Sequence, residues 1–396
     1  MVLRALFMEE ETVMRQEHYD VVVVGAGVIG CAVAYYVARA GLSTALLEKG
    51  RVAGEASQAG AGMLAPLGDE GADPRHPAQQ FYLTALQRYT NLDQQLKQET
   101  GIDIELVDAP TLRVAFDERQ AARLQVIRDS YQDFLPGLQW LDAKTVREVE
   151  PLLPETVQGA LISPEERNVQ VSLLTLAFAR GAALHRARIF EGRPLLRFMQ
   201  QGQRLVGVET EQGPITTSNV VLAAGAWASA WHTKRSTPPI FPVKGQILAL
   251  QAPVDLILRH TLQCQGVGGI IPKADGRIYV GATIEEAGFD KNVTLEGLAT
   301  LRAVVERLAP ALKNARLDRA WAGLRPGSAD HLPLIGASKS LQGLWVAGGH
   351  YRDGILLGPL TGQILAELLQ GHATPSGLDL TAFDPDRFGG WDSSSA

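Results

Sequence analysis

The segment from residue 20 to residue 48 constrains the fold of this 396-residue chain more than any other segment. An apolar run, Val21 to Val24, predicts a buried parallel strand, and a helix-like stretch follows it. A second apolar run ends at Glu48. Strand, turn, helix and terminal acid in this order predict a Rossmann-type dinucleotide site. The turn holds three glycines in G-x-G-x-x-G spacing: Gly25, Gly27 and Gly30.

Each of these residues has a mechanical reason to be there. Gly25 permits the tight turn, and Gly27 lets the backbone approach a pyrophosphate. Gly30 lets the helix pack closely against the strand, and the helix N-terminus then attracts anionic groups. Glu48 is placed to accept hydrogen bonds from ribose hydroxyls.

Two other interpretations of this segment remain open. Residues 21–38 carry no charge, so a membrane span must be considered. The three glycines, the β-branched run before them and the acid after them argue against a span. A glycine-rich strand-turn-helix that binds nothing is the second alternative.

Composition narrows the function classes. The net charge of −6 and the pI near 5.8 do not favour binding to nucleic acid or to an anionic membrane. Cys31 and Cys264 are the only cysteines, which excludes a disulfide framework and a Cys-based zinc site. We therefore expect a reducing, cytoplasmic setting, with residues 1–17 as a flexible N-terminal extension and 376–396 as a C-terminal tail.

The rest of the chain predicts a mixed α/β fold with a large antiparallel insertion. Residues 104–116 read as a strand, and so do residues 219–229, N-V-V-L-A-A-G-A-W-A-S, which end in small residues. Asp275-Gly276 reads as the turn of a hairpin. The first long helix should end at Gly101. Periodicity predicts helices over residues 77–99, 117–132, 173–187, 294–308 and 360–369.

Several motifs carry a family resemblance over residues 18–370. Ala34, Gly41 and Glu48 extend the glycine fingerprint, and A-G-L-R-P-G and G-G-H-Y-R-D-G-I-L-L-G-P contain Arg325 and Arg352. Together with A-G-A-G-M-L-A-P, P-V-K-G-Q and G-R-I-Y-V-G-A-T-I-E, they resemble the D-amino-acid oxidase superfamily of FAD enzymes. The chain looks most like the glycine oxidase branch, which feeds thiamine biosynthesis.

The resemblance implies a glutathione-reductase-like FAD-binding Rossmann domain with a discontinuous, mostly antiparallel β substrate domain. The FAD domain would comprise residues 18–95, 158–235 and 318–375, and the substrate domain 96–157 and 236–317. It also implies a homo-oligomer, a tetramer in this family.

The resemblance further implies FAD contacts. The isoalloxazine would lie near Ala61, Gly62 and Met63 under a cap formed by residues 350–356. FAD would be non-covalent, because the segment W-A-G-L-R-P lacks the cysteine that attaches flavin in sarcosine oxidases. The implied FAD-binding residues are Gly25, Gly27, Val28, Ile29, Gly30, Glu48, Lys49, Ala56, Ser57, Ala61, Gly62, Met63, Leu195, Gly225, His350, Tyr351, Arg352, Asp353, Gly354, Ile355 and Leu356.

The implied reaction is oxidation of a small amino acid. Arg325 would hold the substrate carboxylate bidentately, Arg352 would be a second cationic contact, and Met63 would line the site. Hydride would pass to flavin N5, the imine would hydrolyse, and O2 would become H2O2. Gly269 stands where related glycine oxidases carry a Tyr, so larger or N-alkyl amino acids are also expected.

Three alternatives stay open. The chain could be a dehydrogenase that uses another electron acceptor, or a non-catalytic flavin redox sensor. Either arginine could also belong to a structural ion pair.

Overall fold

The predicted strand and glycine turn lie at the centre of a six-stranded sheet. The structure is a computed structural model that describes residues 17–67, 73–231, 239–374 and 377–388. The strand order is β19-β20-β13-β2-β3-β9, parallel except for the antiparallel pair β19/β20. The strands are β2 (Val21–Val24), β3 (Thr44–Leu47), β9 (Arg188–Phe190), β13 (Val220–Leu222), β19 (Leu334–Ala337) and β20 (Leu344–Gly348).

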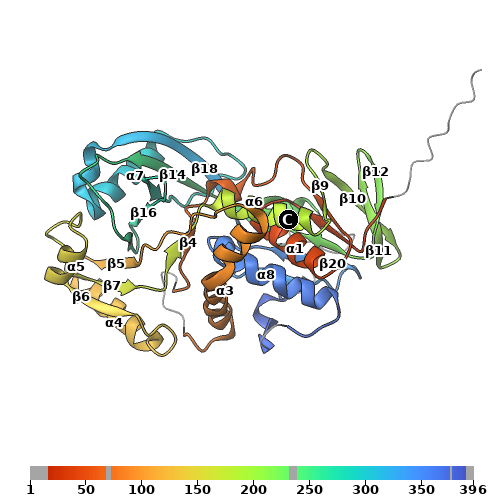
Figure 1. Cartoon of the computed structure of the whole chain (residues 1–396), viewed down its shortest axis with the longest axis horizontal. Coiled ribbons are helices and arrows are strands. Elements are labelled where there is room, and N and C mark those ends of the chain that lie inside the picture. The colour runs from red at the N-terminus through yellow and green to blue at the C-terminus, as the bar shows by residue number, and fades with distance from the viewer. Residues whose placement is uncertain (1–16, 68–72, 232–238, 375–376, 389–396) are drawn as a thin grey trace, which may run out of the picture.

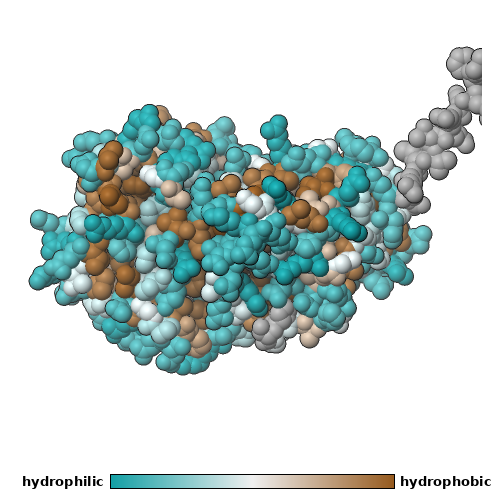
Figure 2. Space-filling view, in the orientation of Figure 1, coloured by the Kyte–Doolittle hydropathy of each residue, from teal (hydrophilic) through white to brown (hydrophobic). Residues whose placement is uncertain are grey.

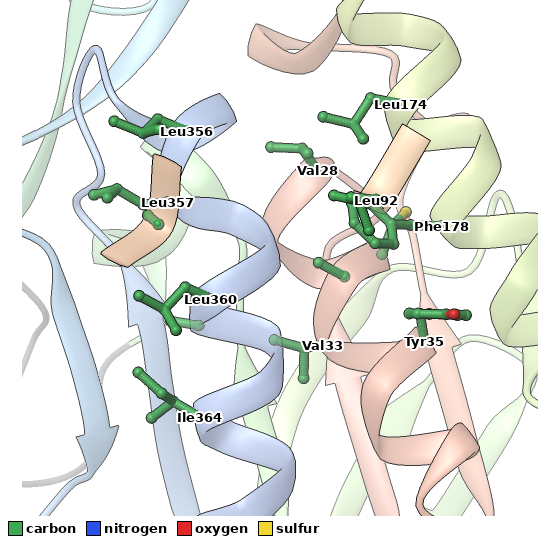
Figure 3. Close-up of a cluster of buried hydrophobic side chains, with 14 of the residues drawn as sticks. Val28, Val33, Tyr35, Leu92, Leu174, Phe178, Leu356, Leu357, Leu360 and Ile364 are labelled. Carbon is green, nitrogen blue, oxygen red and sulfur yellow. The ribbon is translucent and has the colours of Figure 1, made fainter. Parts of the chain in front are cut away.

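Four helices pack beside this sheet. They are α1 (Val28–Arg39), α3 (Pro77–Thr100), α6 (Val171–Leu184) and α8 (Gly354–Leu369). Small residues let α1 and α8 approach closely, since a Cβ on Gly362 would lie 2.7 Å from the carbonyl carbon of Ala32. Figure 3 shows the shared core, whose side chains include Val33 of α1, Leu360 of α8 and Phe178 of α6.

An eight-stranded, mostly antiparallel sheet forms the other half of the molecule (Figure 1). Its order is β18-β14-β17-β16-β15-β5-β7-β6. One face packs against α7 (Leu295–Leu308), and the other presents Ile247, Ile271 and Tyr279 to Ala61 and Met63. The strands are β5 (Thr111–Ala115), β6 (Gln139–Asp142), β7 (Gly159–Ser163), β14 (Ile240–Gln251), β15 (Thr261–Cys264), β16 (Gly268–Pro272), β17 (Arg277–Gly281) and β18 (Arg316–Ser328).

The remaining elements are small. A four-stranded sheet has the order β1-β12-β11-β10, and β4 pairs with β8. These strands are β1 (Glu17–His18), β4 (Met63–Leu64), β8 (Arg167–Asn168), β10 (Leu195–Gln201), β11 (Arg204–Thr210) and β12 (Gly213–Thr216). The other helical elements are α2 (Ala56–Ala59), α4 (Glu118–Tyr131), α5 (Ala143–Val149), η1 (Gly225–Ala230), η2 (Pro310–Asn314) and η4 (Thr381–Phe383).

Most of the predicted elements are confirmed. The mixed α/β class is correct, α3 ends at Gly101 in the left-handed conformation, and Asp275-Gly276 closes the β16–β17 hairpin. The strand predicted over residues 104–116 is too long, since only Thr111–Ala115 forms a strand and Val107 makes an isolated bridge to Asn168. The strand predicted over 219–229 is also too long, because β13 ends at Leu222 and residues 225–230 form a short 3-10 helix. The helix predicted over 360–369 begins earlier, at Gly354, because Pro359 lies inside α8 without ending it.

Sheet membership differs from the predicted domain limits at two strands. β7 and β18 hydrogen-bond within the antiparallel sheet, although residues 158–163 and 318–328 were assigned to the FAD domain. These pairings join strands far apart in sequence, which local patterns do not reveal. The domain limits themselves stay a prediction.

The predicted tail is partly packed. Phe383 is fully buried, with its ring centroid 4.6 Å from that of Phe81, so residues 377–388 belong to the fold. At the other end, Glu17 pairs with Ile215 and bonds Arg193 at 2.8 Å. Residues 1–16, which make up nearly all of the predicted extension, and residues 389–396 lie outside the described part of the chain.

The surface view in Figure 2 shows hydrophobic residues in separate groups between hydrophilic ones. Among the described residues, no helix is both long enough and apolar enough to cross a membrane. The uncharged stretch 21–38 instead forms β2, the glycine turn and α1.

Candidate active site

A cavity of about 910 Å³ joins the glycine turn to the face of the antiparallel sheet. Its walls include Glu48 and Lys49 after β3, Met63 on β4 and Arg325 on β18. This volume is near the upper end of the usual range for ligand pockets, about 300–1,000 Å³. The cavity is therefore large enough for a dinucleotide and a small substrate.

The glycine turn has the geometry that a dinucleotide site requires. Gly25 has a φ of +103°, and a Cβ there would lie 2.4 Å from the carbonyl oxygen of Ala223. A Cβ on Gly30 would lie 1.8 Å from the carbonyl oxygen of Gly25, so this residue serves packing and does not line the cavity. The first turn of α1 carries no acidic residue, so its N-terminus favours an anion. The backbone N–H of Val28 donates to Oγ of Ser57 at 2.8 Å.

Glu48 is held at the end of β3 by backbone donors. Its Oε2 accepts from the N–H of Ala26 and its Oε1 from the N–H of Gly50, both at 2.8 Å. Beside it, burial lowers the pKa of Lys49, whose Nζ lies 3.4 Å from the centroid of the Trp227 ring. The side chains of Glu48, Lys49 and Trp227 therefore form one end of the cavity.

Lys273 fixes the loop that is expected to carry the isoalloxazine. Its buried Nζ donates to the carbonyl oxygens of Ala61 at 3.2 Å and Val169 at 2.8 Å, and to Oδ1 of Asn168 at 2.9 Å. Burial lowers the pKa of this lysine to about 8. The loop is therefore tied to β8 and β16 through one side chain.

His350 is a packed residue at the edge of the cavity. It is 1% exposed, and its Nε2 lies 3.1 Å from Oγ1 of Thr361. Burial lowers its pKa to about 3, so the ring is neutral at ordinary pH. The segment that follows it, residues 351–355, lines the cavity, whereas Leu356 points into the helical core.

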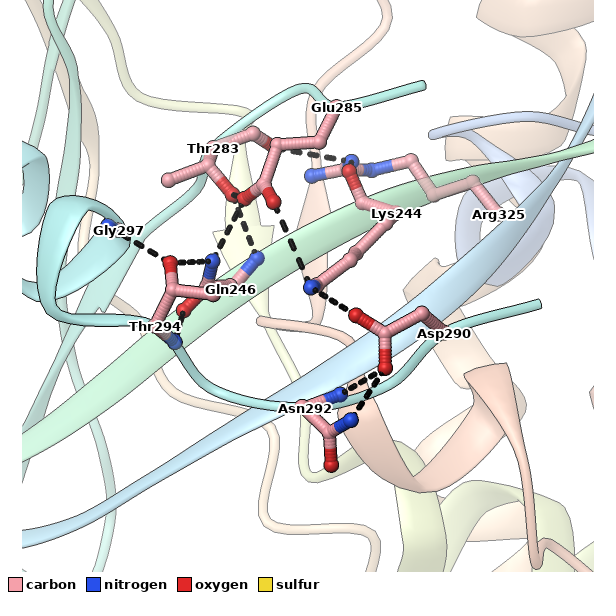
Figure 4. Close-up of polar contacts among 9 residues, drawn as sticks. All are labelled: Lys244, Gln246, Thr283, Glu285, Asp290, Asn292, Thr294, Gly297 and Arg325. Carbon is pink, nitrogen blue, oxygen red and sulfur yellow. Dashed lines mark hydrogen bonds and ion pairs between the residues drawn. The ribbon is translucent and has the colours of Figure 1, made fainter. Parts of the chain in front are cut away.

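Arg325 enters the cavity from β18. Its Nη1 donates to the carbonyl oxygens of Thr283 at 3.0 Å and Lys244 at 3.3 Å (Figure 4). Burial, and to a lesser degree the nearby charge of Arg352, lowers its pKa. Within the described ranges, no carboxylate forms an ion pair with Arg325.

The acids near Arg325 are bound by another cation. Nζ of Lys244, a 1% exposed residue, lies 3.1 Å from Oδ2 of Asp290 and 3.5 Å from Oε2 of Glu285. Gln246 donates to Glu285 at 2.8 Å and to Oγ1 of Thr294 at 3.0 Å, as Figure 4 shows. This network satisfies the carboxylates, and the guanidinium of Arg325 keeps its charge for another anion.

Gly269 lies in the same wall. It pairs with Gln263 on one side and Gly281 on the other, and all three residues line the cavity. A Cβ on Gly269 would lie 3.1 Å from the carbonyl oxygen of Leu262, so a larger residue fits after a small shift. The wall has no side chain where related glycine oxidases are expected to have a Tyr.

The structure brings the predicted site residues together. All of them line the cavity except Gly30 and Leu356. Sequence reasoning missed several residues of the site, although Trp227 and Gly245 stand inside motifs that were noted, A-A-G-A-W-A-S and P-V-K-G-Q. The other residues missed were Arg113, Gln263 and Thr283, which line the cavity, and Lys273, which supports it.

These residues fit FAD. The glycines of the turn place no side chains over the N-terminus of α1, where the pyrophosphate would bind. Backbone hydrogen bonds orient Glu48, which would bind the ribose. Lys273 anchors the loop that contains Gly62, where the isoalloxazine would pack. A Cβ on Gly62 would lie 2.0 Å from the carbonyl oxygen of Val169. Backbone therefore forms the surface on which a flat ring would pack.

Comparison with known proteins agrees with this site. A family model described as "FAD dependent oxidoreductase" matches residues 20–368. Glycine oxidase from Bacillus subtilis (strain 168) is 31% identical over 358 residues, which are 89% of this chain and 94% of that protein. The bifunctional protein ThiO/ThiG from Synechocystis sp. is 32% identical, with 93% of this chain matching 54% of that protein.

A solved structure shows the same fold. Glycine oxidase from Geobacillus kaustophilus superimposes with a TM-score of 0.88 at 32% identity, covering 94% of this chain and 99% of that one. The match includes both sheets that enclose the cavity, because it spans almost the whole chain.

Proposed function

The chain belongs to the FAD dependent oxidoreductase family, and we propose that it oxidises glycine or another small amino acid. The products are the imino acid, which water converts to glyoxylate or a 2-oxo acid and ammonia, and hydrogen peroxide from O2. Its similarity to glycine oxidases over about nine tenths of the chain supports this substrate class.

Arg325 is the observation that carries the proposal. Its guanidinium is buried in the cavity, held by two backbone carbonyl oxygens, while Lys244 binds the nearby acids. A buried cation without an opposite charge is costly, so the site is stabilised by an anionic ligand. The planar fork of Arg325 matches a substrate carboxylate.

The protein contributes binding and orientation. Bound FAD supplies the two-electron acceptor for the hydride that leaves the substrate Cα. Arg325 and Arg352 hold the carboxylate, and Ile247, Ile271 and Met63 exclude water from the region beside it. A substrate bound with its amine neutral needs no base, which agrees with the low pKa of His350, an imidazole too weakly basic to take a proton from an ammonium group.

Arg325→Ala tests this assignment. Removing the clamp should raise the apparent KM for glycine strongly while FAD stays bound. Arg302→Ala is the matched control, because Arg302 is an exposed residue of α7 that bonds Glu306 at 2.8 Å. If Arg325→Ala has wild-type kinetics, Arg325 does not bind the substrate.

The electron acceptor distinguishes the proposal from its alternatives. We propose O2, with a dehydrogenase that uses another carrier as the second candidate and a non-catalytic flavin sensor as the third. One peroxide per amino acid consumed supports the oxidase. Flavin reduction without peroxide supports the dehydrogenase, and a flavin that no amino acid reduces supports the sensor.

Further features of the proposal concern the cofactor and the setting. FAD is non-covalent in this proposal, since the segment W-A-G-L-R-P holds no cysteine and both Cys31 and Cys264 are buried. Flavin that stays on the chain after denaturation would contradict this. We propose that the chain supplies imine for thiazole synthesis in the cytoplasm, and the match to a ThiO/ThiG protein supports the link to thiamine. A homotetramer is expected from the family, and light scattering tests it.

A further inference from the structure

We propose that the cavity contains a side-chain subsite, formed by Gly269, Gln263 and Arg113, for amino acids with a neutral polar side chain about as long as glutamine. The proposal rests on the proposed function, because it takes the substrate carboxylate to lie at Arg325.

Strand register places the subsite in one row. Gly281 of β17 pairs with Gly269 of β16, Gly269 with Gln263 of β15, and Gln263 with Arg113 of β5. Directly paired residues project to the same face of a sheet. Ile247, the partner of Gly281 on its other side, faces Ala61 and Met63. The whole row therefore faces the cavity, and all of its members line it.

Gly281 and Gly269, the two residues of the row closest to Arg325, carry no side chains and form a flat backbone surface, the floor of the subsite. Neighbouring strands lie about 4.8 Å apart, so Gln263 is about 5 Å and Arg113 about 10 Å beyond Gly269. Arg325 binds the carbonyl oxygen of Thr283, which follows Gly281 by two residues. A substrate with its carboxylate at Arg325 can thus extend its side chain over the glycines toward Gln263.

The far end of the row is polar but carries no net charge. Arg113 donates to both oxygens of Glu166 at 2.9 Å, and these residues are 5% and 0% exposed. A charged side chain would lose its hydration here without gaining an opposite charge. A neutral carboxamide would instead exchange hydrogen bonds with the carboxamide of Gln263. This end therefore favours glutamine over glutamate and lysine.

Anaerobic flavin reduction tests the subsite. The holoenzyme is mixed with glycine and with both enantiomers of glutamine, glutamate and lysine, and kcat/KM is compared for each. We expect one enantiomer of glutamine to exceed glutamate and lysine by about tenfold or more, the effect of burying a charge without a partner. Equal values for the three side chains would overturn the proposal.

Two variants and a control test whether the preference for glutamine arises from Gln263 and Gly269. Gln263→Leu should lower the glutamine-to-glycine ratio of kcat/KM by about three- to tenfold, the loss of one hydrogen bond. Gly269→Tyr should lower it by more than about tenfold, because its ring covers the floor. Gln265→Leu is the matched control, since Gln265 is exposed and does not line the cavity. A ratio that moves equally in Gln263→Leu and Gln265→Leu would also overturn the proposal.

A binding measurement separates the subsite from the proposed function. Glutamine without its amino group, 4-carbamoylbutanoate, cannot be oxidised at Cα and is compared with acetate through the change in flavin absorbance. Preferential binding that Gln263→Leu weakens supports the subsite even if no amino acid reduces the flavin, an outcome that removes the proposed function alone. Equal loss of affinity for both carboxylates would contradict the subsite.

Discussion

The guanidinium of Arg325 occupies the space that a side chain on Gly245 would need. A Cβ on Gly245 would lie 2.3 Å from Nη1 and 2.5 Å from Cζ of Arg325. The two residues lie on paired strands, β14 and β18, two pairs apart along the ladder. The glycine of P-V-K-G-Q therefore gives the arginine of A-G-L-R-P-G its place in the cavity.

Gly245→Ala should displace this guanidinium and impair substrate binding. Because a misplacement of about 1 Å can cost about 100-fold, we expect kcat/KM for glycine to fall at least tenfold. FAD affinity should stay near that of the wild type. Gly358→Ala is the control, since a Cβ there meets only ordinary contacts of 3.5 Å or more. Steady-state kinetics decide, and wild-type kinetics in Gly245→Ala would separate Gly245 from Arg325.

Lys273→Met should weaken FAD binding. The substitution removes the donor that joins Ala61, Asn168 and Val169 and leaves buried acceptors without it, at a cost of about 1–3 kcal/mol. Titration followed by flavin fluorescence should give a higher dissociation constant for FAD in Lys273→Met than in the wild type. Lys313→Met, at an exposed position, should bind FAD normally. Equal FAD affinity in the two variants would refute the anchoring role.

The buried charge of Lys273 should also appear in the pH dependence of stability. Its folded pKa of about 8 lies below its ordinary 10.5, so the unfolded chain binds more protons between these values. Lys273 therefore makes the free energy of unfolding rise with pH from about 8 to 10.5. Urea unfolding across this range should show a smaller rise in Lys273→Met. The same slope in both proteins would mean that the lysine is not desolvated.

His350 should likewise make the free energy of unfolding depend on pH, in the acid range. Its pKa of about 3 lies below the ordinary 6.5, so protonation of the unfolded chain should lower stability as the pH falls through this window. His350→Gln should reduce that part of the acid sensitivity, measured by urea unfolding. It should also leave the pH profile of kcat/KM unchanged in shape. A lost inflection in that profile would instead identify His350 as a base.

Glu166→Gln should destabilise the antiparallel sheet. It leaves the buried guanidinium of Arg113 without a carboxylate, at a cost of about 3–5 kcal/mol. The double variant Arg113→Met with Glu166→Leu should recover much of this loss, because it removes both charges. Urea denaturation checks the order of stability, and a neutral effect of Glu166→Gln would show that water reaches the pair.

Local sequence signals predicted the part of the fold around the six-stranded sheet, which contains the glycine turn, well. The Val21–Val24 run, the glycine turn and Glu48 are close in sequence, and their geometry follows from backbone rules alone. Gly101 and the Asp275-Gly276 turn ended their elements as expected for the same reason. Arg325 and Arg352 came from motifs that the family resemblance identified.

The supporting residues could not be predicted, because distant segments create their environments. Lys273 has a lysine's usual polarity, and only the approach of Ala61 and Val169, more than a hundred residues away, buries it. Gln263 and Arg113 come together through the register of β15 with β5. No local pattern distinguishes such residues from surface ones.

Anaerobic mixing of the holoenzyme with glycine, sarcosine, D-alanine and glutamine tests the central claim most directly. We predict that at least one of them bleaches the visible absorbance of the flavin, and that air restores it with one hydrogen peroxide formed per amino acid consumed. Arg325→Ala should require far more substrate for the same bleaching. A flavin that stays oxidised with all four compounds would contradict the account.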